Sequence, residues 1–422
     1  MSGAGHDSGG GGAFAPGIRR FLVGSAFMGA AWAIPWSLLP LYLDRRGFSK
    51  EEIGLVVSCD AWGKVLVALP AAFVLARRAT RPVLLAATLA AALAYALLPW
   101  MPNLHALMAC TLLAGLAWSV HFVAIAPFLY RNSKAPERAR LFGWSEAVHT
   151  GAAVAGAWGS ARLVAFLAPR VAGGEREALA IALATGGGLA LVSAWPYARI
   201  EEAPVEPGER AERPLEVFWR ERARLLRFAL PQLCIALGAG LVIAFLGLYF
   251  QDRFGLAPSA VADLNAVGWL LMTLGYLVTP RLQKRFGYVG SIVALELASI
   301  PFFLVLAFTH SLPFAIAGFF ARGVLMNAAT PVLKNFSMHA TPREARAIQN
   351  GVTSLMSGVG WAISPRLGGW LLDHSGNDYT RLICITVAFY LLAAFTTWAL
   401  LRRLERHADG RSGAEASGAG AA

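Results

Sequence analysis

The stretch LLPLYLDRRGFSKEEIGLVVSCDAWGKVLVALPAAFVLARRATR, residues 38–81, decides the fold because it returns later in the chain. Residues 246–290 read LGLYFQDRFGLAPSAVADLNAVGWLLMTLGYLVTPRLQKRFGYVG, and each copy is an apolar span, a short turn, a second apolar span and a basic turn. A second pair of segments, APERAR at 135–140 and TPREAR at 341–346, recurs in the same order. The repeats predict a chain of two related halves.

The composition restricts the class of protein. Of the 422 residues, 57% are hydrophobic and only 15% are charged, which lies outside the range of ordinary soluble domains. The net charge of +12 does not indicate nucleic-acid binding, because the basic residues are spread over short turns without a dense run. The composition therefore predicts a protein that crosses the lipid bilayer several times.

The order of apolar and polar segments predicts the domain organisation. Twelve apolar spans of roughly 20 or more residues are each long enough to cross a hydrocarbon core of about 30 Å. They are expected at residues 21–43, 51–76, 82–101, 104–130, 141–167, 178–198, 228–250, 259–282, 288–308, 312–336, 347–372 and 382–401. The prediction is a disordered tail (1–17), a six-helix bundle (18–198), a polar linker (199–227), a second six-helix bundle (228–402) and a disordered tail (403–422).

The Lys and Arg residues predict the orientation in the membrane. Most of the 37 fall on the termini, the linker and the alternate turns that share their side of the bilayer. Basic turns stay on the cytoplasmic side of a membrane. We therefore expect a multi-pass protein of the cell inner membrane with both termini cytoplasmic.

Twelve spans in two halves of six around a cytoplasmic linker resemble the major facilitator superfamily (MFS) over nearly the whole chain. The segment PLYLDRRGFSKEEIGLVVS resembles the first outer turn of that family, and APFLYRNSKAPERARLFG resembles its turn between spans 4 and 5. The resemblance implies an all-α membrane protein of twelve transmembrane helices in two six-helix bundles. It also implies a monomer that moves a small molecule by alternating access.

The signature turn of that family, Gly-x-x-x-Asp-Arg-x-Gly-basic-basic, is degenerate in both halves of this chain. The first copy keeps Arg77 and Arg81 but lacks both glycines and the aspartate, and the second keeps Arg285 and Gly287. The resemblance makes these four residues the expected cytoplasmic gate turns. An inside latch that depends on the aspartate has no counterpart here.

Ionisable residues inside the spans are candidates for chemistry, because charge at mid-bilayer is costly and usually faces protein or water. Asp60 and Lys64 are four residues apart, hence on one helix face, and form either a local ion pair or a proton or substrate site. Glu146 and His149, three residues apart, can exchange a proton, although Glu146 also lies near enough to the cytoplasmic end to contact water. Glu296 is unexpected in its span and receives no role.

Arg322 lies near the middle of its span, with Asn327 five residues later. A guanidinium binds carboxylate or phosphate through paired hydrogen bonds, and the alternative is an ion pair with an interior acid such as Asp60 or Glu146. The MFS resemblance places Arg322 beside a central cavity. The same resemblance adds Trp32, Trp36, Trp118, His121 and Tyr249 as candidate binding residues. For His121, packing is the alternative.

The predicted function is secondary active transport of a small organic anion or amphipathic metabolite. The proton gradient is the expected energy source, because no GxxxxGK[ST] phosphate loop is present, and Asp60 and Glu146 are the candidate proton carriers. Multidrug efflux by proton antiport is the alternative, although the proline of the antiporter pattern is absent from GAWG at 156–159. A non-transporting membrane sensor or scaffold is the alternative of another class.

No enzymatic activity is expected, because no nucleophile and base pair stands out in the sequence. The four cysteines lie inside apolar spans without a CxxC pair or a His at ligand spacing, so neither a metal site nor a cofactor is predicted. The expected partners are the solute, protons and lipid.

Overall fold

The computed structural model describes residues 14–77, 79–133, 138–202, 214–275, 279–342 and 345–418, and these residues contain helices and no strand. The helices are α1 (Pro16–Arg45), α2 (Lys50–Arg77), α3 (Thr80–Leu97), α4 (Leu104–Arg131), α5 (Arg138–Leu167), α6 (Gly174–Ala198), α7 (Pro214–Val242), α8 (Leu246–Phe254), α9 (Pro258–Gly275), α10 (Thr279–Phe308), α11 (Leu312–Ala340), α12 (Arg346–His374) and α13 (Tyr379–Gly418). Because the short 3-10 turn Ile243–Phe245 joins α7 directly to α8, these described helices form twelve spans.

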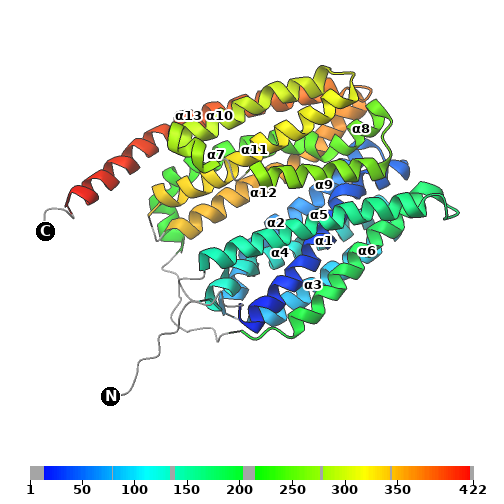
Figure 1. Cartoon of the computed structure of the whole chain (residues 1–422), viewed down its shortest axis with the longest axis horizontal. Coiled ribbons are helices and arrows are strands. Elements are labelled where there is room, and N and C mark those ends of the chain that lie inside the picture. The colour runs from blue at the N-terminus through cyan, green and yellow to red at the C-terminus, as the bar shows by residue number, and fades with distance from the viewer. Residues whose placement is uncertain are drawn as a thin grey trace, which may run out of the picture.

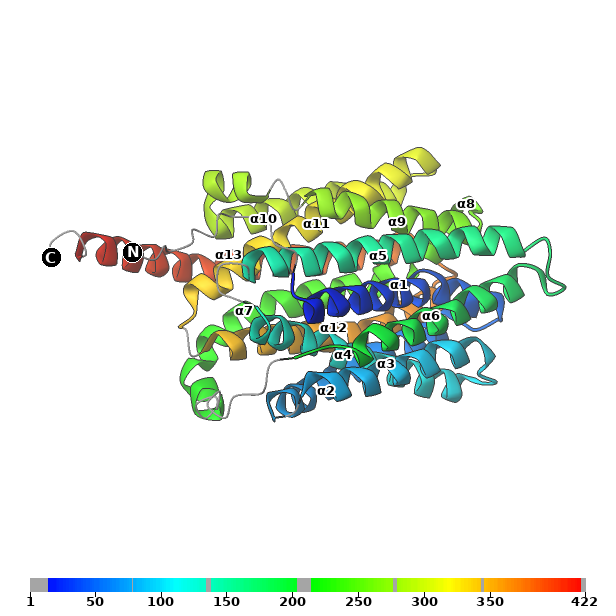
Figure 2. The same ribbon diagram turned by 60° about the horizontal axis from the view of Figure 1, so that its bottom comes forward.

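The spans form two bundles, α1–α6 below and α7–α13 above in Figure 1. Inside them the helices pack in the same pattern: α1 against α5 and α6 corresponds to α7 against α12 and α13, and α3 against α6 corresponds to α10 against α13. The duplication seen in the sequence is therefore also a duplication of packing. In Figure 2 the beginning of α1 and the end of α13 lie toward the same end of the molecule, which we call the inner end.

Apolarity separates eight continuously apolar segments from the four helices that pair across the two bundles. Among the described residues, eight segments are long and apolar enough to cross a membrane: α1, α3, α4, α6, α7 with α8, α10, α11 and α13. The other four pair across the bundles, α2 with α12 and α5 with α9. A helix that covers the other bundle needs a less continuous apolar surface than one surrounded by lipid.

Matched glycines end the first span of each bundle at the outer end. Gly47 has φ +83° and Gly255 has φ +67°, so both adopt the left-handed conformation that side chains with a Cβ avoid. The same residues were aligned by the sequence repeat. Their match has a backbone cause, because each glycine reverses the chain between two long helices.

Three predicted boundaries are corrected by the structure. The first tail was expected to end at residue 17, but α1 already begins at Pro16; residues 1–13 lie outside the described part. The linker was expected to reach residue 227, but α7 begins at Pro214, and residues 203–213 are not described. The last tail was expected from residue 403, but α13 continues to Gly418. Charge ends the membrane span without ending the helix, because Glu, Arg and Ala are good helix formers in water.

Two glutamates cap helices at the inner end, where the family signature is degenerate. The carboxylate of Glu202 accepts the backbone N–H groups of Thr80 (2.8 Å) and Arg81 (3.0 Å) at the start of α3. In the second bundle, Glu405 accepts those of Tyr288 (2.6 Å) and Val289 (3.2 Å). Each cap ties the end of a bundle's last span to its third span.

Of the predicted gate residues whose surroundings the structure describes, Arg81 and Gly287 have backbone roles in these caps and Arg285 is exposed. Gly287 has φ +72°, which breaks α10 and turns the next N–H groups toward Glu405; a Cβ at Gly287 would lie 2.8 Å from Glu405 Oε1. Arg285 is exposed and stacks over Phe286 at 5.3 Å. The side chain of Arg77 lies outside the described part of the chain.

Replacing Glu202 with Gln is expected to destabilise the first bundle by about 1 kcal/mol, because one neutral amide oxygen replaces a carboxylate that caps two N–H groups. The measurement is thermal unfolding of the purified protein, with hydrogen exchange at the start of α3. Glu201→Gln is the control: Glu201 pairs with Arg20 at the surface (2.5 Å) and is 73% exposed, so its loss should matter less. Equal effects of the two changes would contradict the cap.

Candidate substrate cavity

A cavity of about 530 Å³ lies between the two bundles. Its walls come from α1, α2, α3, α4 and α5 of the first bundle and from α7 to α13 of the second. A second space of about 560 Å³ shares Trp36, Asp60, Gln232 and Trp361 with it and extends toward Lys334 and Asn350 near the inner end. The volume suits a small organic molecule.

Tryptophan rings from both bundles line the cavity. The ring centroid of Trp32 lies 5.5 Å from that of Trp36 and 5.8 Å from that of Trp269, and Trp36 lies 5.6 Å from Trp361. The sequence predicted Trp32 and Trp36. It missed Trp269 and Trp361, because the family resemblance draws attention to other spans than α9 and α12. The four rings offer flat apolar faces to a ligand.

Arg322 lies on α11 at the cavity wall and is only 7% exposed. Its guanidinium lies over the ring of Phe303, 4.7 Å from the centroid. Within the described part of the chain no carboxylate lies within ion-pair distance, and Nε has no hydrogen-bond partner. The alternative of an ion pair with Asp60 or Glu146 is therefore not what the structure shows. A buried guanidinium without an acceptor is costly unless a ligand supplies one.

The other predicted polar residues of the cavity are differently engaged. Lys64 Nζ lies 2.5 Å from Asp60 Oδ2, so the predicted local ion pair is present, and Asp60 lines both spaces. The amide of Asn327 donates to Gly323 O (2.8 Å), which leaves its oxygen for the cavity that it lines. Asp60, Lys64 and Asn327 thus have polar partners within the described protein, whereas Nε of Arg322 has none.

Glu146 and His149 both line the cavity from α5. Glu146 is exposed to it, whereas His149 is half-buried with its ring centroid 5.3 Å from that of Trp118. Among the described contacts no hydrogen bond or ion pair joins the two side chains. The carboxylate is therefore reachable from the cavity, while the imidazole is packed against an aromatic ring.

Three candidate binding residues lie behind the wall and do not line the cavity. Tyr249 is fully buried, and its hydroxyl donates to Leu306 O (2.7 Å). His121 is also fully buried, 3.3 Å from the hydroxyl of Tyr197. Trp118 stacks on Trp32 at 5.3 Å. Each of these residues belongs to a helix that contributes other residues to the cavity, but its side chain points into its own bundle. The prediction that the three residues contact a ligand in this cavity is therefore corrected.

A family model described as Major Facilitator Superfamily matches residues 21–302 and 228–421. The chain belongs to the major facilitator superfamily. The solved structure of nucleoside transporter NupG is similar with a TM-score of 0.77 and 14% identity, covering 91% of this chain and 99% of that one. The inward-facing, unoccupied structure of a bacterial homologue of the human lysosomal transporter Spinster gives a TM-score of 0.75 and 14% identity, covering 93% and 97%. No curated protein matches the sequence. Identities this low show the shared MFS fold alone.

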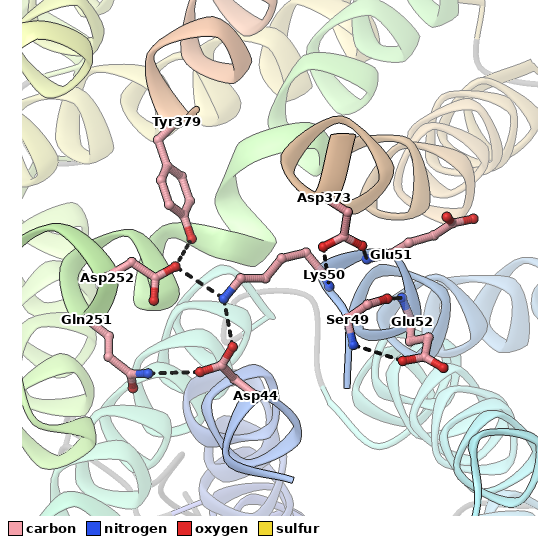
Figure 3. Close-up of polar contacts among 9 residues, drawn as sticks. All are labelled: Asp44, Ser49, Lys50, Glu51, Glu52, Gln251, Asp252, Asp373 and Tyr379. Carbon is pink, nitrogen blue, oxygen red and sulfur yellow. Dashed lines mark hydrogen bonds and ion pairs between the residues drawn. The ribbon is translucent and has the colours of Figure 1, made fainter. Parts of the chain in front are cut away.

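Polar contacts close the outer end of this MFS protein, as Figure 3 shows. Lys50 at the start of α2 is buried, and its ammonium lies 2.7 Å from Asp44 Oδ1 of its own bundle and 3.2 Å from Asp252 Oδ2 of the other. Gln251 donates to Asp44 (3.0 Å), and the hydroxyl of Tyr379 donates to Asp252 (2.7 Å). One lysine thus holds together carboxylates from both bundles.

A carboxylate of the second bundle also caps a helix of the first. The two oxygens of Asp373, at the end of α12, accept the backbone N–H groups of Lys50 (3.0 Å) and Glu51 (2.8 Å). An anion at a helix N-terminus is favourable because the free N–H groups and the helix dipole point toward it. Farther along the same interface, Arg162 of α5 pairs with Asp263 of α9.

These contacts define which end of the cavity is shut. Within the described residues, every hydrogen bond and ion pair that joins the bundles lies in their outer half: those of Asp44, Lys50, Glu51, Arg162, Gln251, Asp252, Asp263, Arg366 and Asp373. At the inner end, the helix caps made by Glu202 and Glu405 stay inside one bundle. The described contacts between the bundles therefore close the outer end of the cavity.

Proposed function

We propose that this protein is a secondary active transporter for a small organic solute that carries an anionic group. The observation that supports the proposal most is Arg322: a permanently charged side chain, 7% exposed, with no acceptor in the described protein and a place on the wall of the central cavity. A carboxylate or phosphate would give it the paired hydrogen bonds that it lacks.

Alternating access is the proposed mode of movement. The outer polar contacts hold the bundles together on one side of the cavity, and a rocking motion of the two bundles would exchange them for contacts at the inner end. The proposed setting is the inner membrane, with a monomer whose termini are cytoplasmic. We also propose that the chain consists of a tail, a first bundle, a linker, a second bundle and a second tail, with the boundaries as corrected above.

Proton coupling is part of the proposal. Asp60 and Glu146 are the carriers, because both carboxylates line the cavity and so meet solute and solvent together. Protonation of Asp60 would release Lys64 from its ion pair. Either residue would then link proton uptake to the charge of the cavity.

Multidrug efflux by proton antiport is the second candidate. It is favoured by the tryptophan walls and by the exposed carboxylate of Glu146, which together suit a lipophilic cation. A lipophilic cation would not bind to the guanidinium of Arg322, so replacing Arg322 distinguishes the two functions.

Replacing Arg322 with Ala is expected to weaken the binding of an anionic ligand by about 10- to 150-fold, as for hydrogen bonds of roughly 1.5 to 3 kcal/mol to a charged group. The measurement is a thermal-shift screen with organic anions, zwitterions, nucleosides and lipophilic cations, because a ligand stabilises the folded state it binds. Nucleosides are included because they are named for NupG, one of the similar structures.

The matched control is Arg170→Ala, since Arg170 is exposed outside the cavity and stacks on Phe166. It should bind like the wild type. Arg322→Lys keeps the charge without the paired donors and should fall between wild type and Arg322→Ala. If only lipophilic cations stabilise the protein, equally in wild type and Arg322→Ala, the anion proposal is wrong and the efflux function replaces it.

A further inference from the structure

A second buried ionisable side chain borders the cavity on the same wall as Arg322. Glu296 on α10 is 1% exposed and lines the cavity, and its Oε2 has no hydrogen-bond partner in the described protein. Thr397 of α13 is the side chain that hydrogen-bonds the carboxyl group. The sequence predicted no role for Glu296, because the family resemblance makes its span one of the outer spans, in which a charged residue is unexpected. Only its packing turns it inward.

Glu296 and Arg322 both line the cavity, and among the described residues no ion pair joins them. The guanidinium rests over Phe303, seven residues after Glu296 on α10. Seven residues are two helical turns, so the two positions lie on one face of α10 about 10 Å apart along its axis. The hydroxyl of Ser299, between them, reaches Met326 of α11 at 3.7 Å, which packs the two helices there. The carboxyl group of Glu296 and the guanidinium of Arg322 thus lie on one buried wall with no ion pair between them among the described contacts.

The spacing fits a ligand that carries both charges. In an α-amino acid about 2.5 Å separates the nitrogen from the carboxyl carbon, by standard bond lengths. With a hydrogen bond of about 2.8 Å at each end, such a group reaches about 8 Å, which is of the same order as the two turns of α10 between Glu296 and Phe303. A simple anion would satisfy Arg322 but would leave the carboxylate of Glu296 without a cation and add a like charge beside it.

We propose that Glu296 is a second substrate-binding residue and that the substrate is a small zwitterion with an apolar body, its carboxylate on Arg322 and its ammonium on Glu296. This proposal rests on the proposed function, which it narrows from organic solutes with an anionic group to amino-acid-like ones. The tryptophan wall formed by Trp32, Trp36, Trp269 and Trp361 receives the apolar body.

The test uses the purified full chain and a matched set of three probes. L-tryptophan carries both charges, indole-3-propionate lacks the amine, and tryptamine lacks the carboxylate. Affinities are measured by equilibrium dialysis at pH 7 for wild type, Glu296→Gln and Arg322→Ala, after all twenty amino acids have been screened by thermal shift. If another amino acid binds more tightly, its own acid and amine form the set. Glu201→Gln is the surface control.

Wild type and Glu201→Gln should bind the zwitterion at least tenfold more tightly than either single-charge analogue. Glu296→Gln, an isosteric change that removes a buried charge without leaving a cavity, should bring the zwitterion to within about twofold of the anion. The inference is overturned if the anion binds wild type as tightly as the zwitterion, if Glu296→Gln keeps the preference, or if no amino acid binds. Binding of the anion that is indifferent to Arg322→Ala would instead contradict the proposed function itself.

Discussion

Replacing Lys50 with Met is expected to open the outer end of the protein. The ammonium of Lys50 is the cation between Asp44 and Asp252, and its side chain is 8% exposed. Without it, two carboxylates from different bundles face one another with no cation between them. Removing one partner of a buried ion pair costs about 3 to 5 kcal/mol. Since Asp44 and Asp252 are 23% and 26% exposed, we expect about 2 to 3 kcal/mol, roughly a 30- to 150-fold loss of the outer-closed state.

The measurement is the distance between spin labels at the outer ends of the two bundles. Trp100 and Phe314 are suitable positions, because they are 59% and 66% exposed. Labels replace them in a protein whose four free cysteines have been removed. Lys50→Met should lengthen this distance for most molecules. Lys50→Arg keeps the charge and should preserve the short distance.

A second variant separates charge repulsion from general damage. Adding Asp252→Asn to Lys50→Met removes the facing carboxylate, so the double variant should recover part of the closed population. If Lys50→Met leaves the distance unchanged, or if the double variant is more open than Lys50→Met, the lysine does not hold the outer end shut.

Replacing Gly54 with Val is expected to reduce transport to a few per cent of wild type or less. A Cβ at Gly54 on α2 would lie 2.2 Å from the backbone oxygen of Pro365 on α12, and one at Gly369 would lie 2.0 Å from that of Lys50. The obstacles are main-chain atoms of a packed helix, which cannot rotate away. Overpacking costs about 1 to 3 kcal/mol even where side chains can adjust, so the outer closure that alternating access requires should fail.

The measurement is uptake into proteoliposomes of a solute identified by the ligand screen, together with the same spin-label distance. Gly351→Val is the matched control, because Gly351 lies on α12 near the inner end with no atom within 4 Å of a Cβ. Both variants add the same side chain to a helix, so propensity does not distinguish them. Wild-type uptake by Gly54→Val would contradict the close approach of α2 and α12, as would equal losses in both variants.

Local regularities in the sequence predicted much of the structure. The i, i+4 spacing of Asp60 and Lys64 predicted that the two side chains share one helix face, and of the alternatives left open the structure shows the ion pair. The repeated segment predicted a short turn after the first span of each copy, and the structure shows these turns at Gly47 and Gly255. The ends of helices were predicted less well, as at Pro214 and Gly418, since hydropathy marks where the bilayer ends and the hydrogen-bonded helix continues into water.

The candidate site was predicted only in part. Arg322, Trp32 and Trp36 lie on the cavity as expected. Tyr249, His121 and Trp118 lie behind its wall, because the rotation of a helix about its axis decides which face meets the cavity. No periodicity reports that rotation in a span that is apolar all round.

The sequence by itself determined the class, the twelve helices and their duplication, because apolar length, basic turns and repeated segments are properties of the chain in order. The tertiary structure alone decided which charges find partners. Lys50 is bound by carboxylates more than two hundred residues apart, while Arg322 and Glu296 share a wall and remain unpaired. Such contacts depend on how separate helices pack, and the free energy of a buried charge is set by the atoms around it and not by its neighbours in sequence.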